Sequence, residues 1–320
     1  MKRIIISTTL ATISFSALTC IDRKTLCWNL FNLFEDATYR EEGLKKIIKY
    51  NPDEDTITLP TLNDKNFFES INDLSICRRK EVRTLLYIYL TKKRDHVKRA
   101  IRRSYLYIDI IKNEFDKYPS IPKDIMLLPL LESGFNPYAI SRSRAVGLWQ
   151  FIRPTSRRLG LKNDKWIDER RDIVKSTNAA IRHLRNLYWI FDSWELSLAA
   201  YNGGGGRVRR AINKTGINDF WKLKKTNTLK TETKEYVSRY AALMLIYKNQ
   251  KLFGIHEEMK DIEKFDTESI VLKYPVNMRH VSKITGVPLA TIRKLNPELI
   301  RNAIPPYYRE YSFRVPTKTL

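Results

Sequence analysis

Residues 125–134 read Ile-Met-Leu-Leu-Pro-Leu-Leu-Glu-Ser-Gly, an apolar helical run that ends in a single carboxyl group. Pro129 is expected to kink this helix, because its ring clashes with the preceding turn and it has no N–H to donate. Desolvation at an apolar helix end disfavours a charged carboxyl, so the pKa of Glu132 is expected to rise toward the range of a general acid. Taken alone, a Glu-Ser pair is more often a solvated helix end, and the interpretation depends on the neighbouring segments.

The neighbouring segments are predominantly helical. From residue 121 to about 247 apolar residues recur at helical spacing, with breaks at 134–137, at Gly160 and at 203–206. Upstream, residues 76–118 predict two basic amphipathic helices, and residues 22–72 an irregular lead. Downstream, residues 270–276 and 311–316 predict strands, with two short helices at 281–284 and 289–295 between them. The chain is expected to be mainly α, with a small strand-helix-helix-strand module at its C-terminal end.

Two further segments combine aromatic and polar side chains. Residues 147–151 read Gly-Leu-Trp-Gln-Phe, which sets the amide of Gln150 beside an aromatic surface on which a pyranose ring can pack. Residues 199–206 read Ala-Ala-Tyr-Asn-Gly-Gly-Gly-Gly, which places Tyr201 and Asn202 where a helix ends. Core packing and helix capping are the ordinary structural interpretations of these segments. A phosphate-binding loop is not supported, since no Lys-Ser/Thr pair or dinucleotide fingerprint follows.

In this order, the three motifs resemble those of the lysozyme-like lytic murein transglycosylases of bacterial cell walls, most closely the membrane-bound type D. The family pattern of Glu-Ser, Gly-Leu-Trp/Met-Gln and Ala-Tyr-Asn is matched at residues 132–133, 147–150 and 200–202. The segments Asp-Glu-Arg-Arg-Asp at 168–172 and Glu-Thr-x-x-Tyr-Val at 232–237 also resemble parts of the family. The resemblance is strong from about residue 121 to 211 and weaker from there to 320. Residues 203–206 depart from the usual Ala-Gly-x-Gly, which bears on loop rigidity more than on chemistry.

The resemblance implies a role for each matched residue. Glu132 would be the catalytic acid and base, and Tyr201 would hold its carboxyl group. The other substrate-binding or supporting residues that it implies are Ser133, Gln150, Asn202, Glu232 and Tyr236. No motif supplies the second carboxylate of a two-acid glycosidase. Asp168 and Asp172, the nearest alternatives, are interpreted as structural because arginines lie beside them.

The reaction implied by the resemblance is cleavage of the β-1,4 bond between N-acetylmuramic acid and N-acetylglucosamine in peptidoglycan glycan strands. The muramic 6-hydroxyl would close a 1,6-anhydro ring, so that no water is consumed. The residue types alone fit a goose-type lysozyme-like hydrolase equally well, and a non-catalytic exported glycan-binding protein is a further alternative. The presence of Glu132 counts against a non-catalytic protein, which needs no acid.

The expected domain organisation has four parts. Residues 1–20 are a signal peptide, 21–110 an N-terminal lead and basic helical region, 111–260 a lysozyme-like transglycosylase domain, and 267–320 a degenerate LysM-like module. The module resembles a glycan-binding LysM fold, but its opening residues, 269–272, lack the usual charged and small side chains. A packing role and a glycan-binding role both remain open for it.

The first twenty residues have the pattern of a secretory signal, with Lys2 and Arg3 before a run of 15 largely apolar residues. Ala17-Leu18-Thr19-Cys20 resembles a bacterial lipobox, in which Cys20 would be acylated, although Thr19 is bulkier than usual. We therefore expect export to the cell envelope, in the periplasm, with lipidation and simple cleavage both open. Cys27 and Cys77 are then either a disulfide pair or two free thiols.

The formal net charge of +23 implies an anionic neighbour. In an exported protein this is expected to be the envelope surface. Nucleic acid, which the basic stretch 78–103 and its tyrosines invite, is not expected as a partner. The scattered histidines and cysteines lack metal-ligand spacing, so neither a metal nor a cofactor is expected.

Overall fold

The computed structural model describes residues 49–51, 56–58, 79–250, 253–255 and 267–317 of the chain. The chain divides into two compact units, residues 1–98 with 237–261 and residues 99–236 with 262–320. The expected signal peptide and the three cysteines, Cys20, Cys27 and Cys77, lie outside the described residues. Within the described ranges, every helix is too short or too polar to cross a membrane.

The first unit contains a short antiparallel hairpin, formed by β1 (Lys49–Asn51) and β2 (Thr56–Thr58) within the segment expected to be irregular. It also contains α4 (Lys80–Leu90), the start of α5 (Arg94–Ser104) and the second part of α13 (Thr231–Lys248). The guanidinium of Arg94 donates to the carbonyl oxygens of Phe253 and Gly254, at 3.2 and 3.3 Å. These bonds tie the first turn of α5 to the chain that follows α13.

Residues 79–118 form three helices, so the prediction of two is wrong in number. The third is α6 (Ile108–Phe115). Helix α4 is followed by Thr91, whose N–H and hydroxyl both donate to the carbonyl of Tyr87. Competition by a threonine hydroxyl for helix carbonyls favours such an end. A further turn after Ser104, closed by the N–H of Tyr107, separates α5 from α6.

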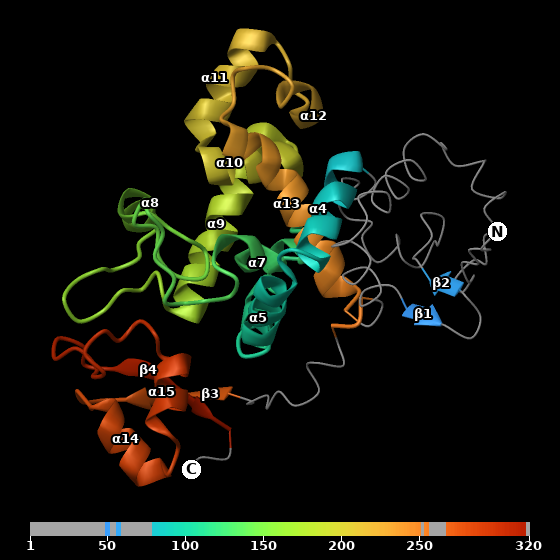
Figure 1. The fold of residues 1–320 in the computed structure, drawn as a ribbon. Helices are drawn as coiled ribbons and strands as arrows, with labels where there is room; N and C mark the ends of the chain where they lie inside the picture. Colours follow the sequence, from blue (N-terminus) through green and yellow to red (C-terminus); the bar gives the residue numbers. More distant parts are fainter. Residues whose placement is uncertain (1–48, 52–55, 59–78, 251–252, 256–266, 318–320) are drawn as a thin grey trace. The chain divides into compact units, whose positions relative to one another are not determined.

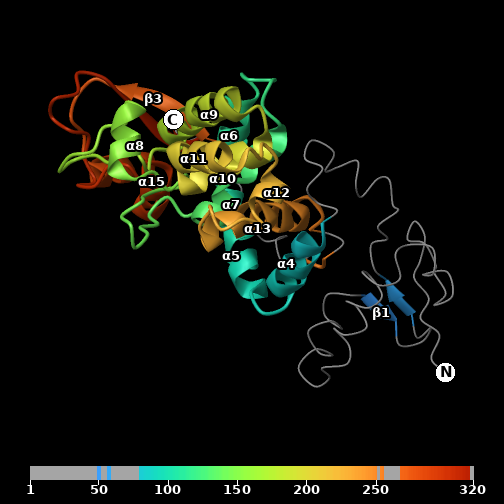
Figure 2. The same ribbon diagram turned by 90° about the horizontal axis from the view of Figure 1, so that it is seen from above.

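The second unit is built around α9 (Ile173–Phe191), against which α6 and α10 (Trp194–Gly203) pack (Figure 2). Asp172 caps α9 by accepting from the N–H of Lys175 at 2.8 Å, and Asp192 ends the helix in the left-handed conformation. The apolar residues that α9 buries are Ile173, Ala179, Ala180, Ile181, Leu184, Leu187 and Phe191. The same part of the unit also contains α8 (Arg153–Arg158), α11 (Gly205–Thr215) and α12 (Phe220–Leu223).

The apolar run that ends at Glu132 is divided at Pro129. Residues before it form a 3₁₀ helix, η3 (Lys123–Leu127), and the proline opens the short α7 (Pro129–Glu132). Proline is tolerated at the first helical position because its missing N–H has no partner there. Glu132 is therefore the last residue of a helix whose preceding turns are buried.

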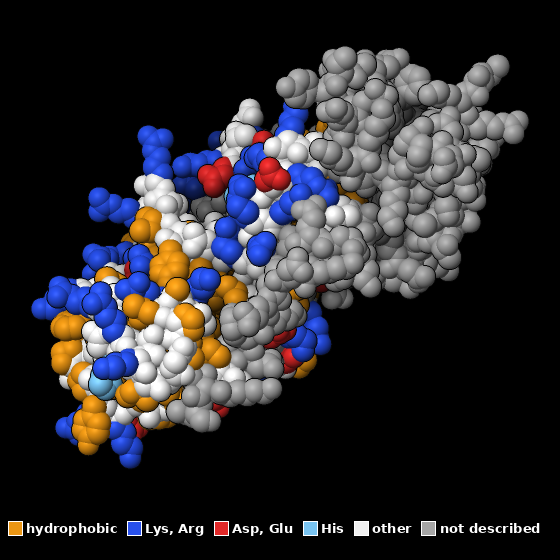
Figure 3. All heavy atoms as spheres, turned by 60° about the horizontal axis from the view of Figure 1, so that its bottom comes forward, with side chains coloured by type: hydrophobic (Ala, Val, Ile, Leu, Met, Phe, Trp, Pro, Cys, Tyr) orange, Lys and Arg blue, Asp and Glu red, His pale blue; other side chains and the backbone are white. Residues whose placement is uncertain are grey.

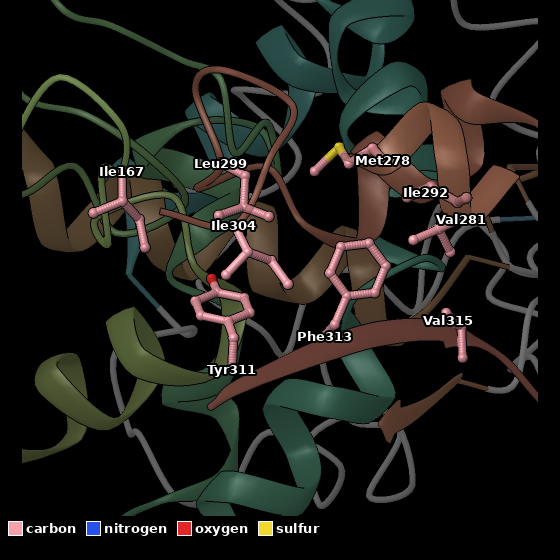
Figure 4. Close-up of a cluster of buried hydrophobic side chains, with 9 residues drawn as sticks. All are labelled: Ile167, Met278, Val281, Ile292, Leu299, Ile304, Tyr311, Phe313 and Val315. Atoms are coloured by element: carbon pink, nitrogen blue, oxygen red, sulfur yellow. The ribbon is translucent and has the colours of Figure 1, made fainter. Parts of the chain in front are cut away.

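The C-terminal module consists of β3 (Thr267–Leu272), α14 (Met278–Thr285), α15 (Leu289–Leu295) and β4 (Tyr311–Pro316) (Figure 1). The strands pair antiparallel, from Thr267 opposite Pro316 to Leu272 opposite Tyr311. The buried cluster of this module includes Ile167, which belongs to the segment before α9 (Figure 4). The prediction of a mainly α chain with a βααβ module is confirmed.

Candidate active site

Glu132 faces the start of α13. The hydroxyl of Tyr236, a buried residue of that helix, donates a hydrogen bond to Oε1 of Glu132. Burial raises the pKa of Glu132 to about 7, although the bond from Tyr236 opposes the rise, and the negative charge of Glu232 adds to it. A carboxyl group that is partly protonated at neutral pH can both donate and accept a proton.

The hydroxyl of Tyr201 does not hold this carboxyl, so that part of the sequence interpretation is corrected. It donates to the backbone carbonyl of Trp149 at 2.7 Å. A phenol has one hydrogen to give, and here it fixes the loop that carries the Gly-Leu-Trp-Gln motif. Burial and the charge of Glu132 both raise the pKa of Tyr201, which keeps its hydroxyl a donor.

Asn202 joins the end of α10 to the start of α13. Its Nδ2 donates to Oε1 of Glu232 at 3.1 Å, and its Oδ1 accepts from the hydroxyl of Thr233 at 2.8 Å. A Cβ on Gly203 would meet that same hydroxyl at 2.8 Å. The close approach of the two helices therefore depends on the amide of Asn202 and on the absence of a side chain at Gly203. It brings the charge of Glu232 near enough to raise the pKa of Glu132.

The segment of residues 144–151, called the motif loop below, is held at several points. Ser133 Oγ donates to the carbonyl of Leu148 at 2.9 Å, and Trp149 Nε1 donates to Thr177 Oγ1 at 3.0 Å. Gln150 donates from Nε2 to the carbonyls of Gly147 and Ala139, at 2.8 and 3.3 Å. Among the described residues its Oε1 accepts no hydrogen bond, so this oxygen is the part of the amide that remains for a ligand.

The carboxylates of Asp168 and Asp172 are both engaged in structure. Asp168 forms a bidentate pair with Arg170, at 2.9 and 2.8 Å. Burial would raise the pKa of Asp168, but the hydrogen bonds and charge of Arg170 outweigh it and lower this pKa. Asp172 caps α9 and contacts Arg314 at 3.3 Å. In the described part of the chain, no group of three or more His, Cys, Asp or Glu side chains is placed to hold a metal ion.

Residues 109–224 match the family model of the transglycosylase SLT domain. The matched residues are called the SLT domain below. Residues 266–320 match the model of the LysM-like domain of the lytic transglycosylase MltD. The resemblance to lytic murein transglycosylases is therefore confirmed, and all three sequence motifs lie inside the SLT domain. Glu232 and Tyr236 follow its last matched residue.

Two relatives of the chain are named as lytic murein transglycosylases. The membrane-bound lytic murein transglycosylase D of Escherichia coli (strain K12) is 38% identical over 185 residues, 56% of this chain and 40% of that protein. The membrane-bound lytic murein transglycosylase C of Photorhabdus laumondii subsp. laumondii is 26% identical over 162 residues, 43% of this chain and 45% of that protein. The chain thus spans less than half the length of these relatives. The 70 kDa soluble lytic transglycosylase of Escherichia coli is 22% identical, with a TM-score of 0.40, over 72% of this chain and 35% of that one.

Two residues that the sequence did not single out also contact the site: His183, inside the SLT domain, and Arg103, which precedes it. The ring of His183 on α9 lies 5.5 Å from that of Tyr201. Burial lowers the pKa of His183 to about 4, so it is a neutral packing partner at pH 7. Arg103 donates from Nε to the carbonyl of Gly134 at 2.7 Å, just after the Glu-Ser pair. A lone histidine and one arginine of a basic helix gave no signal in the sequence.

Proposed function

We propose that this chain is a peptidoglycan lytic transglycosylase in which Glu132 is the only acid and base. The observation that carries the proposal is the carboxyl of Glu132, with a pKa raised to about 7 and a hydrogen bond from Tyr236. The SLT domain and the names of its relatives support the reaction class. We assign the catalytic domain to residues 111–260 and the LysM-like module to residues 267–320.

In the proposed reaction, protonated Glu132 donates its proton to the glycosidic oxygen that joins N-acetylmuramic acid to N-acetylglucosamine. The C1–O bond of the muramic residue breaks while the oxygen of its own acetamido group stabilises C1. The carboxylate of Glu132 then takes the proton of the muramic 6-hydroxyl, whose oxygen bonds to C1. One bond is broken and one is formed, no water is used, and Glu132 returns to its protonated state.

The neighbouring residues serve this acid and its substrate. Tyr236 orients the carboxyl, and the charge of Glu232 favours its protonated form. The free Oε1 of Gln150 is proposed to accept from a hydroxyl or N–H of the glycan, and Ser133 to lie close to the sugar. Asn202 contributes indirectly by holding the end of α10 against the start of α13, and Tyr201 by holding the motif loop.

A goose-type lysozyme-like hydrolase remains the second candidate, since the same single carboxyl could activate a water molecule. The family of the SLT domain favours the transglycosylase. A non-catalytic glycan-binding protein would have no use for a carboxyl whose pKa lies near 7.

The pH dependence of cleavage tests the role of Tyr236. Since the acid must be protonated, kcat/KM of the wild-type protein is expected to fall as the pH rises through about 7. The bond from Tyr236 lowers the pKa of Glu132, so Tyr236→Phe is expected to move this fall to higher pH and to reduce the maximum rate about tenfold. Tyr201→Phe is the matched control, and its alkaline limb is expected to stay in place. If kcat/KM of Tyr236→Phe falls at the same pH as that of the wild-type protein, Tyr236 does not affect the pKa of Glu132.

We also propose that the protein is exported to the periplasm and held at the envelope by lipidation of Cys20 and by its charge. The two lytic murein transglycosylases named above, D and C, are described as membrane-bound. Figure 3 shows Lys and Arg side chains spread over one face with few acidic side chains among them. Attraction to anionic polymers or phospholipid weakens as salt screens it. N-terminal sequencing of the envelope fraction, before and after a high-salt wash, tests both means of attachment.

A further inference from the structure

Residues 162–172, called the junction segment below, are bonded to the C-terminal module along most of their length. The N–H of Asp168 donates to the carbonyl of Glu298, and the N–H of Ile300 to the carbonyl of Trp166, each at 2.9 Å. Ile167 between them is fully buried in the module's cluster (Figure 4). Side-chain bonds from the module's Arg301, Tyr307 and Tyr308 end on Lys165, Asp164 and Glu169.

A buried charge cluster lies at the end of this junction. Arg314 of β4 donates from Nη2 to both carboxylate oxygens of Glu298 at 3.0 Å and to Oδ2 of Asp172 at 3.3 Å, and from Nε to the carbonyl of Leu295 at 2.6 Å. The exposed fractions of Arg314, Asp172 and Glu298 are 5%, 2% and 0%. Without the guanidinium, two carboxylates would face each other away from water, which is strongly unfavourable. Arg314 therefore holds the module on the residue that caps α9.

The junction segment also supports the motif loop. Arg170, fixed by its pair with Asp168, donates from Nη1 to the carbonyls of Arg144 and Phe151, each at 3.2 Å. The carbonyl of Arg170 lies so close to Gly147 that a Cβ there would be 1.9 Å away. Helix α9, capped by Asp172, carries the Thr177 hydroxyl that accepts from Trp149. Both neighbours of Gln150 are thus held by the junction segment or by the helix that follows it.

We propose that Arg314 is a positioning residue of the reaction: by holding the module on the junction segment, it fixes the motif loop and the amide of Gln150. The module is then a structural part of the catalytic unit, whereas the sequence leaves packing and glycan binding equally open. The expected effect of Arg314 on kcat/KM rests on the proposed function. Its expected effect on the order of the motif loop does not.

Hydrogen exchange of the full chain, followed by mass spectrometry, tests the structural side. In Arg314→Met, hydrogen exchange in peptides that cover the motif loop and the junction segment is expected to be about tenfold faster or more. Without the bonds of Arg314, these segments unfold locally more often. Arg314→Lys keeps the charge but cannot bond to Glu298, Asp172 and Leu295 together, so a smaller increase is expected. Arg309→Met, on an exposed arginine of the same module, is the matched control and is expected to change neither peptide.

Kinetics on soluble glycan fragments provide the second readout. We expect kcat/KM to fall about 10-fold to 100-fold in Arg314→Met, as small misplacements of a site do, and to be partly restored in Arg314→Lys. Faster exchange confined to residues 267–317, with normal kcat/KM, would overturn the inference. If Arg314→Met does not fold, Arg314→Lys decides by the same two readouts. If the wild-type protein cleaves no glycan, the proposed function fails, and the exchange result still decides whether Arg314 supports the loop.

Discussion

Glu132→Gln is expected to leave the protein folded and to lower its cleavage of peptidoglycan by about 10²-fold or more. The substitution keeps the shape of the side chain and an oxygen that accepts from Tyr236, but it removes the transferable proton. The release of soluble glycan from purified sacculi, measured for the wild-type protein and the variant at the same pH, gives the ratio of their cleavage rates. Glu268→Gln, an identical chemical change on an exposed residue of β3, is the control and is expected to keep the wild-type rate.

The same variant is expected to be more stable than the wild-type protein above neutral pH. Burial raises the pKa of Glu132 from 4.5 to about 7, so the folded protein binds this proton more tightly than the unfolded chain. The wild-type protein therefore loses stability as pH rises from about 4.5 through about 7, and the Gln variant is spared this loss. With the carboxyl's partial access to water taken into account, the difference is about 1 to 3 kcal/mol. Thermal unfolding at pH 4 and pH 8 measures it, and a less stable variant at pH 8 would contradict the assigned pKa.

Gly147→Ala is expected to destabilise the protein strongly, although it adds only one methyl group. Gly147 has a φ of +86°, and an added Cβ would lie 1.9 Å from the carbonyl oxygen of Arg170. Because that oxygen belongs to the backbone, the junction segment itself would have to move. The left-handed backbone and the overlap together are expected to cost about 3 kcal/mol or more. Chemical denaturation measures this change in the free energy of unfolding.

Gly160→Ala separates the two causes. Gly160 has a similar φ, +80°, but nothing lies within 4 Å of the added Cβ. Only the backbone strain remains, so a loss of about 1 kcal/mol is expected. Equal losses in the two variants would show that the contact with Arg170 does not constrain the loop.

Much of the fold could be predicted because its signals are local. The break at Pro129, the glycine-rich end of α10 and the two strands of the module follow from neighbouring residues. The place of Ile167 in the module's cluster could not be predicted, because its apolar partners lie more than a hundred residues further along the chain. The buried bond between Asp172 and Arg314 joins residues 142 apart, and no pattern in either segment indicates it.

The candidate site shows the same division between local and distant information. The carboxyl of Glu132 at the end of an apolar helix could be predicted, and so could its raised pKa. Which tyrosine reaches it could not, since Tyr201, which is partly buried, and Tyr236, which is buried, both lie near helix ends and carry the same phenol group. The difference is set by the approach of α10 to α13, where Asn202 and Gly203 meet Glu232 and Thr233.

The products of sacculus digestion test the central claim most directly. Purified sacculi are digested in water labelled with heavy oxygen, and the released glycans are weighed by mass spectrometry. We expect products one water lighter than those of a lysozyme, with no heavy oxygen at the muramic end, since the 6-hydroxyl replaces water. Products that carry the added water with its label would contradict it, and would assign the chain to the hydrolases.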